Sequence, residues 1–361
     1  MSEVASFSVG YTRFLDPAGR PVGPLPPFAA DADTVIALYR ALVLTRTFDA
    51  KAIALQRTGR LGTYASSLGQ EAVAVGVGAA MRPEDVLVPS FREQGAQILR
   101  GVEMAELLLY WGGAERGSDY SGPVEDFPIC VPVGTHAPHA AGVAMAFKLR
   151  GEVRCAVCVF SDGATSCGDV YEAMNFAGVR QLPVVFVVNN NQWAISVPRQ
   201  AQTAAQTLAQ KAIAAGFDGV QVDGNDVIAV RDVMEKALAQ ARQGLGPTLV
   251  EAITYRLSDH TTADDASRYR DDAEVSARWT EGPVARLRTY LSDLGAWTKQ
   301  DEEALIADCG AQVDAAVEIY LATPALPPEA MFDHLYAVLP PSIAAQRAAL
   351  LASDEDEAAP A

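Results

Sequence analysis

Short apolar runs alternate with amphipathic stretches through the middle of the chain. The apolar runs are rich in β-branched residues and too short for helices, so they predict buried strands at 86–89, 155–160, 184–188, 220–222 and 248–253. Helical spacing of apolar residues predicts helices over 31–58, 69–81 and 140–150. Strands that alternate with helices are typical of βαβ units. We therefore predict an α/β fold with a mostly parallel sheet flanked by helices.

The two ends of the chain differ from this middle part. Residues 1–30 are rich in proline and glycine, which predicts an extended N-terminal arm that lies on a neighbouring surface rather than forming core. Residues 31–350 are expected to form a single domain, helical and polar beyond about residue 275. Residues 351–361 form an acidic tail, expected to be solvated and frayed.

Composition narrows the possible functions. Half of the 361 residues are hydrophobic and 20% are charged, which excludes a disordered chain. The net charge of −17 disfavours binding to nucleic acid, because the phosphate backbone repels it. The longest apolar run, 72–81, is far shorter than the roughly 20 residues of a membrane span, and the first residues show no targeting pattern. We expect a cytoplasmic protein that does not bind membranes.

Five cysteines do not suggest a disulfide framework. Cys155 and Cys158 form a C-x-x-C pattern, but they lie within an apolar run that reads as a buried strand. We therefore expect a structural role for them rather than redox chemistry or metal binding.

The segment 160–198 carries the most specific chemistry. Asp162 and Gly163 close one predicted strand and open a helix, and a helix N-terminus favours an anionic phosphate. The next strand ends in three asparagines, of which Asn191 is the last. Neighbouring parallel strands end at one edge of the sheet, where such folds bind ligands. A carboxylate and an amide oxygen that meet there suit Mg²⁺, with phosphate and water completing its shell. The alternative for Asp162 alone is a helix N-cap.

This segment resembles the diphosphate-binding motif of thiamine diphosphate enzymes, with Ser161 in place of the first glycine. The whole chain, from about residue 30 to 340, is similar to alpha subunits of the first component of 2-oxo acid dehydrogenases, of pyruvate and branched-chain types. Three further blocks carry the resemblance: 59–72 (GRLGTYASSLGQEA), 88–95 (VPSFREQG) and 255–270 (YRLSDHTTADDASRYR). It implies a thiamine-diphosphate-binding fold.

The resemblance also assigns roles to individual residues. It implies that the side chains of Asp162 and Asn191 and the carbonyl of Trp193 hold Mg²⁺. The expected cofactor-binding residues are Phe91, Arg92, Val133, Gly163, Ala164 and Arg256, together with the metal ligands and His260. Without the resemblance, each arginine would be read as part of a surface salt bridge.

His260 is the strongest catalytic candidate, since it stands in a polar loop that offers no apolar face. His136 is a second, substrate-side candidate, whereas His139 is as well explained by a structural role. No role is assigned to His334. The resemblance places the carboxylates of Asp169 and Glu172 near a dimer axis, and ordinary solvated charges are the alternative.

The activity that the resemblance implies is the oxidative decarboxylation of pyruvate with reductive acetylation of lipoyl groups on a dihydrolipoyl acyltransferase. The alternative substrate is a branched-chain 2-oxo acid. The chain has room for only the diphosphate half of the cofactor site. The implied assembly is therefore two alpha plus two beta chains, in which the beta subunit supplies the glutamate that activates the cofactor. A non-catalytic scaffold would be expected to lack His260 and Arg256, and both are present.

Overall fold

The computed structural model describes residues 3–333 and 335–358, and it divides into two compact units between Val317 and Glu318. His334 and the last three residues of the predicted acidic tail lie outside the described residues. Each unit is described by itself below.

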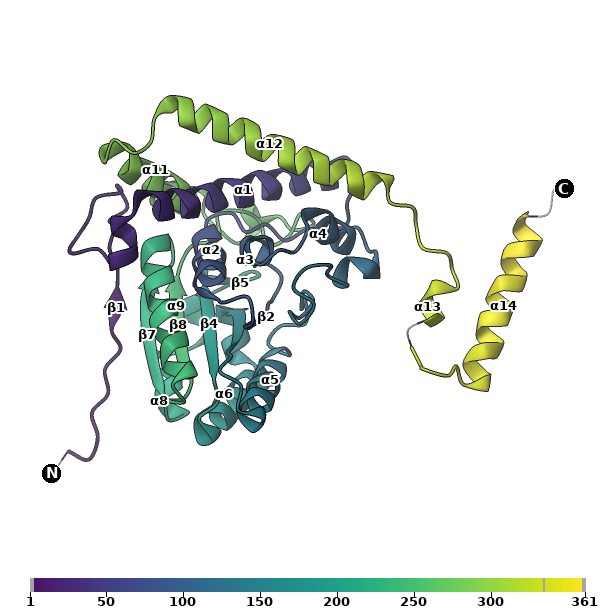
Figure 1. Ribbon diagram of the computed structural model, residues 1–361, viewed down its shortest axis with the longest axis horizontal. Helices are drawn as coiled ribbons and strands as arrows, with labels where there is room; N and C mark the ends of the chain where they lie inside the picture. Colours follow the sequence, from purple (N-terminus) through teal and green to yellow (C-terminus); the bar gives the residue numbers. More distant parts are fainter. Residues whose placement is uncertain (1–2, 334, 359–361) are drawn as a thin grey trace. The chain divides into compact units, whose positions relative to one another are not determined.

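The first unit is built on a parallel sheet, which in the described residues has six strands in the order β1-β7-β8-β4-β3-β2 (Figure 1). Its strands are β1 (Tyr11–Thr12), β2 (Val86–Val88), β3 (Ala156–Ser161), β4 (Val184–Asn190), β7 (Asp218–Asp223) and β8 (Thr248–Ile253). A separate hairpin pairs β5 (Trp193–Ala194) with β6 (Val197–Pro198). All five predicted strands are present, and the α/β fold class is confirmed.

Helices join the strands and cover both faces of the sheet. The α-helices of the first unit are α1 (Ala32–Arg57), α2 (Glu71–Ala80), α3 (Gln94–Leu99), α4 (Met104–Trp111), α5 (Ala137–Arg150), α6 (Gly168–Arg180), α7 (Arg199–Gln202), α8 (Lys211–Ala214), α9 (Val227–Arg242), α10 (Asp272–Arg278), α11 (Pro283–Asp293) and most of α12 (Lys299–Ala322). Short 3₁₀ turns are η1 (Pro27–Ala30), η2 (Glu115–Ser118), η3 (Asp162–Ser166), η4 (Ala266–Arg268) and η5 (Trp279–Glu281).

Alternate residues of each strand enter two different cores, as the pleat of a sheet requires. In β3, Cys158 and Phe160 pack with α5 and α6, whereas Val157 and Val159 pack with α2 and α9. A third layer of α1, α11 and α12 covers α2 and α9. Cys155 and Cys158 therefore face opposite sides of the sheet, and both are free thiols. Their burial in two different cores fits the structural role expected for them.

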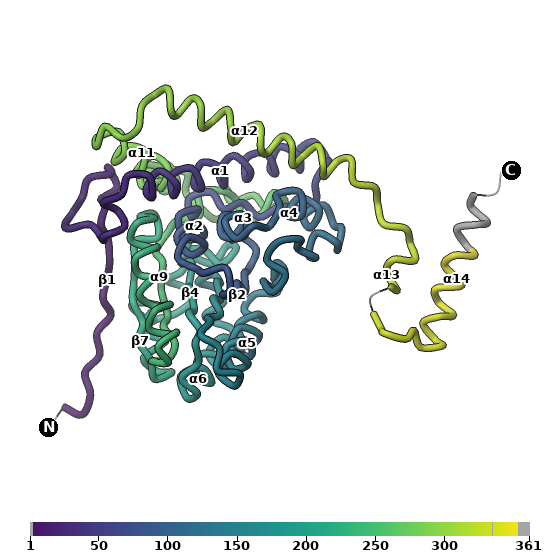
Figure 2. Tube along the Cα trace, viewed as in Figure 1, coloured from purple at the N-terminus to yellow at the C-terminus, as the bar shows by residue number. Residues whose placement is uncertain are grey.

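The N-terminal arm contributes more to the core than its composition predicts. Residues Tyr11–Thr12 add a strand, β1, beside β7 (Figure 2). Leu15 is buried. The side chain of Asp226 accepts hydrogen bonds from the backbone N–H groups of Phe14 and Leu15, each at 2.7 Å. The prediction of an arm outside the core is thus wrong for this segment. Asp226 supplies acceptors that local sequence patterns do not reveal.

The second unit contains α13 (Ala330–Asp333) and α14 (Pro341–Ala358). The described part of the predicted tail is helical, because α14 continues to Ala358. The helix accords with the high helix propensity of alanine and glutamate, and the fraying of the tail stays a prediction. No helix within the described residues has the length and apolar character needed to cross a membrane.

Candidate active site

The carboxyl ends of β3 and β4 bring the predicted diphosphate motif together. The two strands pair in register from Ala156 opposite Val184 to Ser161 opposite Asn189, so Asp162 and Asn191 follow adjacent strand ends. Ser161 has φ −84° and ψ 169°, extended backbone that any residue adopts. Serine in place of the family's glycine therefore does not strain the turn.

Asp162 presents a free carboxylate oxygen to this edge. The residue is fully buried, and burial raises the pKa of its carboxyl group. Its Oδ2 accepts a hydrogen bond from Gln202 Nε2 at 2.8 Å, whereas Oδ1 is buried and has no partner among the described residues. A buried carboxylate oxygen without a partner is costly unless a cation or donor meets it.

Asn191 and Trp193 offer two more oxygens next in the chain. Asn191 Oδ1 accepts a hydrogen bond from the backbone N–H of Trp193 at 3.2 Å, and Asn191 Nδ2 donates to Gln70 Oε1 at 3.1 Å. The carbonyl of Trp193 accepts from Arg256 at 3.3 Å. One carboxylate, one amide oxygen and one carbonyl form a hard-donor set that fits Mg²⁺. The described residues contain no cluster of three or more acidic, His or Cys side chains suited to a metal, and this set needs only one carboxylate.

Two buried arginines converge on His260. Arg92 donates to the carbonyl of His260 at 2.7 Å and approaches its Nδ1 at 3.1 Å, and Arg256 approaches the same nitrogen at 3.4 Å. Arg256 is fully buried and also donates to the carbonyl of Ile195 at 2.8 Å. Among the described residues, neither arginine has a carboxylate within salt-bridge distance. Two buried cations with no carboxylate in direct contact favour an anion such as a diphosphate.

The electrostatics of this cluster set the protonation of His260. Burial and the charges of Arg92 and Arg256 lower the pKa of His260 to about 4, so the imidazole is neutral near pH 7. A guanidinium can only donate, so Nδ1 must be the acceptor and the ring proton resides on Nε2. The ring also packs edge-on against Phe91, with centroids 6.0 Å apart. The expectation that His260 has no apolar contact is therefore wrong.

The loop that carries His260 is held by its own polar side chains. Asp264 Oδ2 accepts from the backbone N–H of His260 at 2.9 Å and also from the hydroxyl of Tyr269. Tyr269 in turn accepts from Arg256 at 2.8 Å. Arg270 donates to the carbonyls of Arg256 and Ser258. These bonds fix the direction in which the imidazole faces.

His136 and Val133 lie apart from this hydrogen-bonded cluster. His136 is buried just before α5, its Nε2 lies 2.8 Å from the carbonyl of Val159, and burial lowers its pKa. Val133 is exposed, and its carbonyl accepts from the thiol of Cys167 at 3.5 Å. No hydrogen bond within the described residues joins either one to Arg92, Arg256 or His260. Their assigned roles remain predictions.

Other candidates lie at the surface. Asp169 and Glu172 are exposed on α6, so their placement near a dimer axis stays a prediction. His139 is exposed and stacks on Phe127, with ring centroids 6.0 Å apart, which fits the structural alternative.

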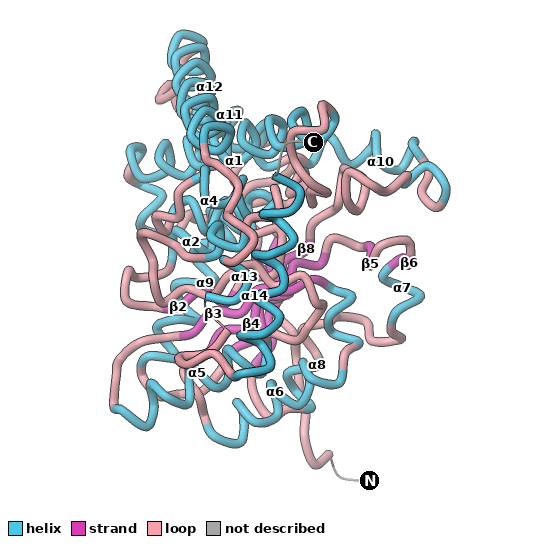
Figure 3. The backbone as a smooth tube through the Cα atoms, turned by 90° about the vertical axis from the view of Figure 1, so that its right-hand side faces the viewer, coloured by secondary structure: helices cyan, strands magenta, loops and turns pink. Residues whose placement is uncertain are grey.

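Sequence reasoning missed the side chains that hold this site from behind. Gln70 and Gln202 contact the two predicted metal ligands. Asp49, buried in α1, accepts from Tyr64, Ser66 and Ser67, and Arg92 donates to the carbonyl of Ser66. Gln70 stands inside the 59–72 block, which is the only signal that could have found it. Figure 3 shows the β5–β6 hairpin and α7, the elements that carry Trp193 and Gln202.

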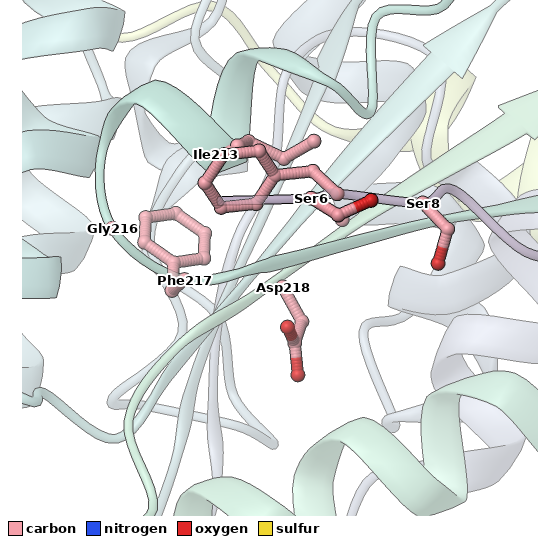
Figure 4. A pocket seen from close by; sticks show the side chains of 8 residues that line it. Ser6, Ser8, Ile213, Gly216, Phe217 and Asp218 are labelled. Carbon is pink, nitrogen blue, oxygen red and sulfur yellow. The ribbon is translucent and has the colours of Figure 1, made fainter. Parts of the chain in front are cut away.

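Two cavities lie outside this cluster or at its border. One, of about 370 Å³, lies between the N-terminal arm and the start of β7, where Ser6, Ile213, Phe217 and Asp218 line it (Figure 4). It is at the amino ends of the strands, the wrong edge for the motif. The other, of about 500 Å³, is lined by Trp193 and several amide side chains.

Comparison with known proteins identifies the family of this chain. The family model described as "Dehydrogenase E1 component" matches residues 39–329. The 3-methyl-2-oxobutanoate dehydrogenase subunit alpha of Mycobacterium tuberculosis is 43% identical over 89% of this chain and 87% of its own length. Pyruvate dehydrogenase E1 component subunits alpha of Acholeplasma laidlawii and Staphylococcus aureus are 40% and 38% identical, over 87% of this chain and 92% and 85% of their lengths.

These matches span most of the chain, and an alpha subunit of this kind implies a beta-subunit partner. The chain belongs to the dehydrogenase E1 component family and is the alpha subunit of a thiamine-diphosphate-dependent 2-oxo acid dehydrogenase.

Proposed function

We propose that this chain, assembled as two alpha plus two beta subunits, catalyses the oxidative decarboxylation of pyruvate and the reductive acetylation of lipoyl groups on a dihydrolipoyl acyltransferase. The observation that carries the proposal is the pair of buried, unpaired arginines at Arg92 and Arg256, next to the free oxygen of Asp162. Thiamine diphosphate supplies the carbanion-stabilising chemistry when bound. The protein binds and orients the cofactor and moves protons.

The residues at the sheet edge would hold the cofactor. Arg92 and Arg256 would bind its diphosphate with charge-assisted hydrogen bonds, and Phe91 would line the same place. The backbone N–H groups of Gly163 and Ala164 would face the phosphate oxygens from η3. Asp162, Asn191 and the carbonyl of Trp193 would hold Mg²⁺.

His260 would move protons at this site. Its neutral ring carries a proton on Nε2 while Arg92 and Arg256 hold Nδ1, so the N–H group at Nε2 is free to donate a hydrogen bond. A bound diphosphate would offset the two guanidinium charges and raise the pKa of His260 toward neutrality. The same group could then accept a proton as well as donate one.

A branched-chain 2-oxo acid is the second candidate substrate. The relative from M. tuberculosis favours it by name, whereas the relatives from A. laidlawii and S. aureus favour pyruvate. One added methylene in an apolar pocket changes preference by only about 1–3 kcal/mol, so a small difference in the lining of the pocket is enough to change the preferred substrate.

Turnover of 2-oxo acids with an artificial electron acceptor tests the proposal. The chain is assayed alone and co-expressed with its beta subunit, with thiamine diphosphate and Mg²⁺. We expect activity only in the mixture, with pyruvate preferred over 3-methyl-2-oxobutanoate. Equal activity of the chain alone would refute the two-subunit assembly, and the reverse preference would assign the branched-chain activity.

A matched pair of variants tests the site itself. Arg256→Met removes a buried, unpaired cation, and we expect loss of cofactor binding. Arg268→Met, in the same loop, removes an exposed arginine whose partner is Asp265, and we expect cofactor binding to remain. Equal binding by the two variants would contradict the proposed diphosphate site.

A further inference from the structure

We propose that Gln70 and Gln202 are positioning residues that fix the orientation of the two predicted metal ligands, Asn191 and Asp162. The inference rests on the proposed Mg²⁺ site and adds the side chains that would make it rigid. Each glutamine is hydrogen-bonded to one ligand, and the two come from different parts of the fold, the start of α2 and the end of α7.

Gln202 fixes one end of the carboxylate of Asp162. Its Nε2 carries two N–H groups, which donate to Asp162 Oδ2 at 2.8 Å and to the carbonyl of Val197 at 3.1 Å. The carboxylate is thus tied to the β5–β6 hairpin through one oxygen. Rotation about the side chain would break that bond, so Oδ1 stays the oxygen without a partner in the described structure. The bond selects which oxygen meets the cation.

Gln70 performs the corresponding task for Asn191. Asn191 Nδ2 donates to Gln70 Oε1 at 3.1 Å, which directs the amide nitrogen toward α2 and the amide oxygen away from it. The oxygen is the atom that can ligate a metal, so a flipped amide would present the wrong group. Gln70 is itself buried, and its Nε2 has no partner among the described residues.

Both glutamines are held by the frame of the fold. Gln70 follows a tight turn at Gly69, which has φ +87° and where an added Cβ would lie 2.4 Å from the carbonyl of Tyr255. The loop after Gln202 is bound to the sheet by Glu251, a buried carboxylate that accepts from the backbone N–H groups of Leu208 and Ala209 at 2.8 and 2.9 Å. Neither glutamine depends on a metal for its position.

Outer partners of this kind orient metal ligands, and their loss typically weakens metal binding about 10–100-fold. Neither amide nitrogen can ligate Mg²⁺, and the oxygen of Gln70 is already used by Asn191. Gln202 contacts Asp162 through its nitrogen and Gln70 contacts Asn191 through its oxygen, so the hydrogen bonds assign each glutamine an action through its ligand.

The test measures Mn²⁺ binding in the enzyme assembled with its beta subunit, in the presence of thiamine diphosphate, by the electron paramagnetic resonance signal of free Mn²⁺. The variants are Gln202→Met and Gln70→Met, which keep side-chain length and remove the hydrogen bonds. The controls are Gln210→Met, partly exposed like Gln202, and Gln97→Met, a buried glutamine that donates to Tyr120.

We expect the Kd for Mn²⁺ to rise about 10–100-fold in each variant and to stay near the wild-type value in each control. Saturating metal should restore kcat, because the ligands themselves remain. Unchanged Mn²⁺ binding by the Gln202 variant would overturn the inference. Tighter binding would also overturn it, because it would show that Gln202 competes with the metal for Asp162. Gln202 is partly exposed, so its variant decides the matter even if the buried Gln70 variant unfolds.

The wild-type enzyme separates this inference from the function on which it rests. Mn²⁺ binding by the wild type with unchanged variants refutes only the positioning role. A wild-type enzyme that binds no Mn²⁺ with thiamine diphosphate refutes the proposed metal site.

Discussion

The turn at Gly163 has almost no room for a side chain. An added Cβ at this position would lie 2.8 Å from the Cβ of Ala194 in β5, closer than real Cβ atoms approach. In Gly163→Ala, η3 and β5 must therefore move apart. Asp162 belongs to η3 and Trp193 belongs to β5. The displacement therefore acts directly on two of the predicted metal ligands.

The expected cost follows from this overlap. Overpacking by one methyl group in a tight site typically costs about 1–3 kcal/mol. Since 1.4 kcal/mol corresponds to a factor of ten in an equilibrium constant, a cost of this size that falls on the ligand-binding geometry weakens cofactor binding in Gly163→Ala by about 5- to 150-fold. Ala194→Gly removes the methyl group that the new side chain would meet, so the double variant should regain most of this loss.

Calorimetric titration of thiamine diphosphate with Mg²⁺ into the assembled enzyme measures the effect. Gly168→Ala is the matched control, because no described atom lies within 4 Å of a Cβ added there, outside its own helix and chain neighbours. We expect the control to bind normally. The reasoning is refuted if Gly168→Ala weakens binding as much as Gly163→Ala does, or if Ala194→Gly fails to restore affinity to the double variant.

Two further predictions concern titration and the N-terminal arm. Burial and the two neighbouring arginines lower the pKa of His260 from 6.5 to about 4, so the folded chain binds fewer protons than the unfolded chain between these values. The free energy of unfolding should therefore fall as pH drops from about 6.5 to 4. Denaturant titrations at several pH values should show a smaller fall in His260→Gln than in the wild type. An identical dependence of the unfolding free energy on pH would contradict the lowered pKa. Asp226→Ala leaves the N–H groups of Phe14 and Leu15 unpaired and removes the N-cap of α9, so denaturant titration should show a loss of about 3 kcal/mol. Asp31→Ala removes only an exposed N-cap of α1 and should cost about 1 kcal/mol, and equal losses would show that Asp226 is merely a cap.

Much of the fold could be predicted from local patterns. Most of the predicted strands are buried on both faces, such as β4, whose apolar run is rich in valine and too short for a helix, whereas β7 is partly exposed. β1 was missed because its two residues, Tyr11 and Thr12, have no apolar pattern of their own. Their pairing with β7 depends on Asp226 and Asp223, which lie more than 200 residues away in the chain.

In the candidate site, too, some features could be predicted from the sequence and others could not. Asp162 and Asn191 could be predicted from the sequence. Each follows the end of a predicted strand, and four sequence blocks resemble those of the family. The lowered pKa of His260 could not be predicted, since it arises from burial and from two arginines of which one is 168 residues away in the chain. Gln202 likewise gave no signal, because its significance lies only in which atom it contacts.

The sequence by itself determined five strands of the sheet and the family, and it predicted residues for the chemistry. Each of these depends on local periodicity or on particular residue types at a characteristic spacing. Only the tertiary structure decided which buried arginines lack a carboxylate in direct contact and which oxygen of Asp162 has no hydrogen-bond partner. It also decided that Cys155 and Cys158 face opposite sides of the sheet. Burial and hydrogen-bond partners are set by the packing of segments distant in the chain, and desolvation then determines how strongly each group demands a ligand.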